Sequence, residues 1–148
     1  MNTYPADSTT RASGADLAKL YAIVLGVILT VLGVLGFIPA IAPNGYLFTV
    51  FAVDPVHNFF HLATGLAGLG VALAVGGLYA RIYAGVIGVI YGIATIIGWS
   101  QGHTVLDLFS VNLGDNILSL VIAVTALAVF FFSASVAMNR ARQHSLAS

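Results

Sequence analysis

The chain has 148 residues, of which 59% are hydrophobic and only 7% are charged. Five basic and five acidic side chains leave no net charge. Soluble domains carry about 25% charged residues, so these ten charges exclude a soluble domain of this size. The lack of a positive excess argues against a nucleic-acid partner. The absence of cysteine excludes disulfides, thiol catalysis and thiolate metal sites. The composition therefore indicates an integral membrane protein.

Four long runs contain no charged residue, and they cover residues 20–53, 55–80, 82–106 and 116–139. A hydrocarbon core takes about 20 helical residues to cross, and a helix satisfies its own backbone hydrogen bonds. We therefore predict an all-α membrane protein with four transmembrane helices in an up-down-up-down bundle. The predicted helices span residues 17–38, 56–77, 80–99 and 114–138, between cytoplasmic tails at 1–16 and 139–148.

The basic residues all fall on one side of the membrane in this predicted topology. They precede the first helix, separate the second from the third, and follow the fourth: Arg11, Lys19, Arg81, Arg140 and Arg142. The loops at 39–55 and 100–113 contain no basic residue. The positive-inside rule then predicts that both termini are cytoplasmic and that the two longer loops lie outside.

The two halves of the chain resemble each other, which suggests two tandem parallel helical-hairpin repeats at 17–76 and 79–138. The first and third helices align at an offset of 62, which pairs Lys19 with Arg81. The second and fourth helices align at an offset of 58, which pairs Asp54 with Asn112. Parallel repeats of this kind are related by an axis along the membrane normal.

Small residues recur every fourth position on the first and third helices, and such ridges let helices approach closely in lipid. The expected helix-packing residues are Ala18, Ala22, Gly26, Ala80, Ala84, Gly88 and Gly92. Their partner is either another helix of the bundle or a second protein.

Polar residues gather where the second and fourth helices begin. Asp54 and Asn112 are predicted N-caps, and Asp54 is followed by proline at the first helical position. Asp115 lies three residues after its cap, as in a capping box. Asn58 and Asn116 are expected to bond across the bundle or to loop carbonyls.

Two interpretations of this region stay open, and the structural one is favoured. The alternative is a divalent metal site at the outer face, formed by His57, His61, His103 and Asp107, or a haem site. Ser119 stands where a duplicated site would repeat His61. No cofactor is predicted from the favoured interpretation.

With these residues in view, the chain resembles a bacterial four-helix membrane family, domain of unknown function 4383. The similarity rests on residues 53–65 (VDPVHNFFHLATG), on Ala80-Arg81-Ile82-Tyr83, and on Asp115-Asn116. It covers about residues 17–138 and implies a bacterial inner membrane, but it implies no activity.

We expect a protein without enzymatic activity, because the sequence offers no catalytic set and no glutamate. The favoured function is an accessory or scaffold subunit of a larger membrane complex. Its partners would be the lipid bilayer and either other membrane subunits or further copies of this chain. A passive small-solute transporter is a second alternative, although no charged residue lies at the middle of a predicted span.

Overall fold

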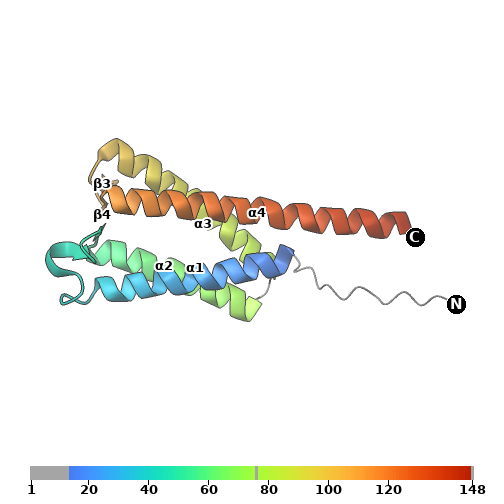
Figure 1. The fold of residues 1–148 in the computed structure, drawn as a ribbon, viewed down its shortest axis with the longest axis horizontal. Helices are drawn as coiled ribbons and strands as arrows, with labels where there is room; N and C mark the ends of the chain where they lie inside the picture. Colours follow the sequence, from blue (N-terminus) through green and yellow to red (C-terminus); the bar gives the residue numbers. More distant parts are fainter. Residues whose placement is uncertain (1–13, 76, 148) are drawn as a thin grey trace.

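The computed structural model describes residues 14–75 and 77–147, with side chains for 14–75 and 78–133. Four long helices dominate the described chain (Figure 1). They are α1 (Gly14–Gly36), α2 (Pro55–Gly70), α3 (Gly77–Gln101) and α4 (Leu113–Ala147). The π-helical segment η2 (Val71–Val75) continues α2.

The helices alternate in direction and form one bundle. Helix α1 packs along α2, α3 packs along α4, and α1 also contacts α3 and α4. The start of α1 and the end of α4 lie at one end of the bundle, and the α1–α2 and α3–α4 connections lie at the other (Figure 1). All four helices are long and apolar enough to span a membrane. The predicted fold class is confirmed, and we treat the chain as a multi-pass membrane protein.

The helix boundaries differ from the predicted ones by one to three residues, except at the end of the last helix. The first helix, for example, spans Gly14–Gly36, whereas its prediction was 17–38. The last helix continues to Ala147, whereas its prediction ended at 138. Residues 139–147 contain no glycine or proline, and charged residues end a membrane span without ending a helix. The side chains of Arg140 and Arg142, and all of Arg11, lie outside the described residues.

Two β-hairpins replace the loops expected between the helices. The first hairpin follows the 3-10 turn η1 (Pro43–Gly45) and pairs β1 (Tyr46–Leu47) with β2 (Phe51–Ala52). The second hairpin pairs β3 (Thr104–Val105) with β4 (Phe109–Ser110), in the same register 58 residues later. Both tips are left-handed, at Phe48 and Thr49 and again at Leu106 and Asp107.

The small-residue ridges are buried within the bundle itself. Ala18, Ala22, Ala80 and Ala84 have no exposed surface. A Cβ on Gly26 would lie 2.9 Å from the carbonyl oxygen of Gly65 in α2. A Cβ on Gly88 would lie 2.7 Å from the Leu127 side chain in α4. Each ridge therefore packs on the neighbouring helix of its own hairpin.

Gly92 differs from the other ridge positions. A Cβ there would lie 3.7 Å from the Cβ of Ala123, which is an ordinary contact. Close approach of α3 and α4 therefore does not require glycine at this position.

Candidate functional site

Helix caps organise the outer end of the bundle, which is the end that carries the hairpins. The Oδ1 atom of Asp54 accepts hydrogen bonds from the backbone N–H groups of Val56 and His57, both at 2.9 Å. The Oδ1 atom of Asn112 accepts from the N–H of Asp115 at 3.1 Å, and Asp115 Oδ2 accepts from the N–H of Asn112 at 2.9 Å. Both predicted caps and the predicted capping box are confirmed.

The same carboxylates also join the two hairpins. Asp54 Oδ2 accepts from the N–H of Ser110 in β4 at 2.6 Å. Asp115 Oδ2 accepts from the N–H of Ala52 in β2 at 3.0 Å. The Nδ2 group of Asn112 donates to the carbonyl of Val50 at 2.8 Å. Each half therefore caps its own helix and holds the hairpin of the other half, which the sequence analysis did not predict.

The surroundings of Asp54 favour its ionised form. Partial burial by itself raises the pKa of this carboxyl. Hydrogen bonds from the backbone N–H groups of Ser110 and His57 outweigh the burial, so the pKa of Asp54 lies below the ordinary value of 3.8. A negative charge next to the first turn of α2 is also favoured by the helix dipole.

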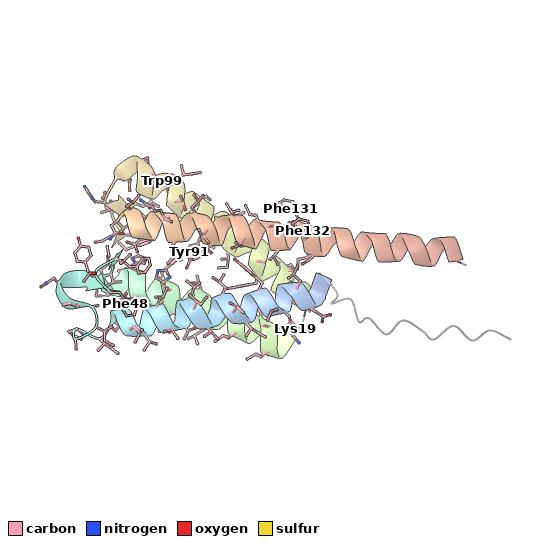
Figure 2. The ribbon with its side chains drawn as sticks, viewed as in Figure 1. Lys19, Phe48, Tyr91, Trp99, Phe131 and Phe132 are labelled. Carbon is pink, nitrogen blue, oxygen red and sulfur yellow. The ribbon has the colours of Figure 1, made fainter. Side chains whose placement is uncertain are left out.

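A buried pair of histidines lies one turn into α2. The Nε2 atoms of His57 and His61 are 2.8 Å apart, and their ring centroids are 4.6 Å apart. The Nδ1 atom of His61 lies 3.3 Å from the Tyr91 hydroxyl, in the interior of the bundle (Figure 2). That hydroxyl lies 3.3 Å from Oγ1 of Thr64, which donates to the carbonyl of Phe60 at 2.8 Å.

One arrangement of protons satisfies this whole chain. His57 donates through Nε2 to His61, His61 donates through Nδ1 to Tyr91, and Tyr91 donates to Thr64. The Nδ1 atom of His57 then remains as a buried acceptor, and it has no hydrogen-bond partner in the structure.

Asn58 and Asn116 lie at matching places and pack against glycines. The Asn58 side chain contacts the position where Gly36 would carry a Cβ, and Asn116 does the same at Gly98. The Oδ1 atom of Asn58 is buried without a hydrogen-bond partner. This oxygen packs against the backbone of α1, so it makes no bond across the bundle.

The structure does not assemble the four predicted metal ligands. His103 and Asp107 are exposed on the second hairpin, where Asp107 accepts a hydrogen bond from Thr104 at 3.0 Å. His57 and His61 are buried in the bundle and bond to each other. Among the described residues, no three His, Cys, Asp or Glu side chains are grouped to hold a metal ion.

Two small cavities flank the histidine pair. Each offers about 10 Å³ to the centre of a water-sized sphere. That is roughly the space that one water molecule needs. One cavity is lined by Asn116 and Ser119 as well as by the two histidines, and the other by Asp115. The polar centre is therefore sealed against anything larger than water.

A comparison with known protein families gives one match, over the helices and caps described above. The family model described as "Domain of unknown function (DUF4383)" matches residues 19–132. The chain belongs to this family. The match confirms the resemblance inferred from the sequence, and it includes the caps, both hairpins and the histidine pair.

Comparisons with the curated proteins and with the solved structures found no match. The family description names no activity. The function must therefore be argued from the geometry of this chain.

Proposed function

We propose that this protein is a non-catalytic accessory or scaffold subunit of a larger complex in a bacterial inner membrane. The main support for this proposal is that the polar centre around His57 and His61 is buried and has room for no more than a water molecule. The side chains able to do chemistry are buried, with exposed fractions of 5% for His57 and 7% for His61. A catalytic group must reach a substrate, and a cavity with room for one water admits none.

The contacts between the hairpins suit a structural role. Asp54 accepts from Ser110, Asp115 accepts from Ala52, and Asn112 donates to Val50, so these bonds tie both hairpins together at the outer end. The bond between Asp115 and Ala52 is buried, and a satisfied buried polar contact favours one arrangement of the elements that carry it. We infer that the outer end acts as a fixed platform.

The tip of each hairpin exposes one large apolar side chain beside a polar one. Phe48 is 54% exposed and Leu106 is 58% exposed, and both have positive φ angles at matching positions of the two hairpins (Figure 2 labels Phe48). A bulky residue with positive φ is strained, and such strain is concentrated at functional sites. These two tips are the surface that we propose for contact with a partner subunit.

Native mass measurement in mild detergent tests the proposal. We expect a particle heavier than the single chain, containing a second membrane protein or further copies of this chain. The double variant Phe48→Ser, Leu106→Ser should release the partner while the helix content stays unchanged. Leu20→Ser, at an exposed position near the opposite end of α1, is the matched control. A strictly monomeric wild-type chain would overturn the proposal.

We further propose that both termini face the cytoplasm, as the distribution of basic residues predicts. The start of α1 and the end of α4 share one end of the bundle (Figure 1), which supports termini on the same side. Reporters that work on only one side of the membrane, placed at each terminus and in each hairpin, test this orientation. Termini on opposite sides would contradict it.

We also propose that the chain arose by duplication of one helical hairpin. The support is the agreement of backbone detail 58 residues apart. Strand register, left-handed tips and the closing hydrogen bonds all recur, including Val53 N–H to Gly45 and Val111 N–H to His103. Solved structures of relatives that place the two hairpins differently would contradict a shared origin.

A further inference from the structure

We propose that an anionic phospholipid binds in a groove between α3 and α4, with an acyl chain in the groove and its phosphate on Arg81. The groove has a volume of about 470 Å³. Its walls are Gly85, Val86, Val89 and Ile90 of α3 with Leu127 and Phe130 of α4. This volume is within the range of about 300–1,000 Å³ that is typical of small-ligand sites.

Gly85 shapes one wall of the groove. In the first half, the position that aligns with Gly85 is Ile23, which is partly buried against the core. A Cβ on Gly85 would lie 2.8 Å from the ring of Phe130. Glycine at position 85 therefore lets Phe130 pack directly on the α3 backbone, and the groove lies beside this contact.

Arg81 stands one helical turn before Gly85 and contacts Phe130, which lines the groove. Its Nε–H donates to the carbonyl of Phe130 at 3.1 Å, and its guanidinium carbon lies 4.6 Å from the centre of the Phe130 ring. A guanidinium has further N–H donors on its two Nη atoms. These contacts hold the cation in place through Nε and the ring, so a phosphate would be bound by the Nη donors.

The two features fit one ligand. The residues of α3 that line the groove extend over positions 82–90, roughly 12 Å at 1.5 Å per residue. An acyl chain that follows them toward the middle of the membrane would leave its phosphate beside Arg81. Arginine binds phosphate in a bidentate manner, and basic pockets between helices on the cytoplasmic side bind anionic headgroups. A zwitterionic lipid has the same chains and the same phosphate, but it also carries a cation that would lie near Arg81, so the groove should discriminate by headgroup.

Native mass spectrometry with added lipid tests this site. Dioleoyl-phosphatidylglycerol should bind as one molecule per chain, and dioleoyl-phosphatidylcholine about tenfold more weakly, because its choline cation is repelled by the Arg81 cation. Arg81→Gln should weaken phosphatidylglycerol about tenfold, because the charged hydrogen bond to the phosphate is lost. Val89→Phe, which fills the groove, should weaken both lipids because fewer methylenes are buried.

The first half supplies matched controls. Lys19→Gln and Val27→Phe change the residues that align with Arg81 and Val89, and neither should alter lipid binding. Thermal unfolding followed by circular dichroism shows whether each variant is folded. If Arg81→Gln does not fold, the preference of the wild-type chain for phosphatidylglycerol still decides the headgroup claim.

Three results would overturn the proposal. They are equal binding of the two lipids, unchanged binding by Val89→Phe, and a wild-type dimer that Val89→Phe converts into monomers. The last result would assign the groove to a second copy of this chain.

Discussion

The seam between α1 and α2 and the seam between α3 and α4 share one backbone pattern, but different atoms meet at two matching positions. A Cβ on Gly33 would lie 2.7 Å from the backbone nitrogen of Leu62, and one on Gly65 would lie 2.8 Å from the carbonyl of Gly26. In the second half, Thr95 and Ala123 stand at the positions of Gly33 and Gly65. At these positions backbone therefore meets backbone in the first seam, whereas side chains lie between the helices in the second.

The two halves also differ in their chemistry. The first half carries the histidine pair, and Ser119 replaces the second histidine in the other half. The carboxylate is the N-cap itself at Asp54, but it is the third residue of the helix at Asp115. Although the polar groups are exchanged, the N–H groups of His57 and Asp115, and those of Ser110 and Ala52, are bonded in matching ways.

The largest expected effect on stability is at Gly33, where α1 packs on the backbone of α2. Gly33→Ala should destabilise the protein by about 3 kcal/mol, because the new methyl group meets backbone atoms that cannot move independently. Gly92→Ala, between α3 and α4, should change the free energy of unfolding by less than about 1 kcal/mol, because the new methyl group has ordinary contact distances. Unfolding in mixed micelles with increasing SDS measures both. Equal losses in the two variants would show that the seams do not differ.

The next effect concerns the buried carboxylate. Asp115→Ala leaves the N–H groups of Ala52 and Asn112 without an acceptor and should cost about 2 kcal/mol. Asp54→Ala should cost about 1 kcal/mol, because its site is partly exposed and water replaces part of the lost bonding. Asp115→Asn, which retains an acceptor oxygen, should recover part of the loss. A larger loss of stability in Asp54→Ala than in Asp115→Ala would contradict this explanation.

The histidine pair should have a smaller effect. His61→Ser places in α2 the residue that α4 has at the matching position. It removes the bonds to His57 and Tyr91 and should cost about 1 kcal/mol. Ser119→Ala is the control, with an expected change below about 0.5 kcal/mol. Loss of a bound metal or of a spectroscopic band from His61→Ser would instead favour the metal or haem alternative.

The smallest effect is a pH dependence at Asp54. Its folded pKa is lowered, so the unfolded chain takes up the proton more readily and the carboxylate contributes stability above the unfolded pKa. That contribution is lost as the pH falls through the folded pKa, below 3.8. The stability difference between wild type and Asp54→Asn should therefore be constant near neutral pH and shrink in that acidic window. A stability difference between the two proteins that grows as the pH falls would contradict a lowered pKa at Asp54.

The helices and caps were predictable because their signals are local. Apolar runs of sufficient length define the spans, and Asp54-Pro55 and Asn112 with Asp115 define two helix starts. The hairpins were not predictable. Their tight turns place Phe48-Thr49 and Leu106-Asp107 in left-handed conformations that asparagine and glycine normally occupy. Contacts within each hairpin and with the helix caps stabilise those turns, such as the bonds from the Leu106 N–H to Gln101 and from the Ala52 N–H to Asp115.

The sequence by itself determined the membrane class, the four spans and the positions of the caps, because hydrophobicity and capping depend on residues near one another in the chain. Only the tertiary structure decided how these parts meet. It placed His57 and His61 beside Tyr91, left His103 and Asp107 exposed, joined each hairpin to the carboxylate of the other half, and left a groove beside Gly85. These contacts join residues from different helices and hairpins, and no local pattern specifies which side chains face each other across a bundle.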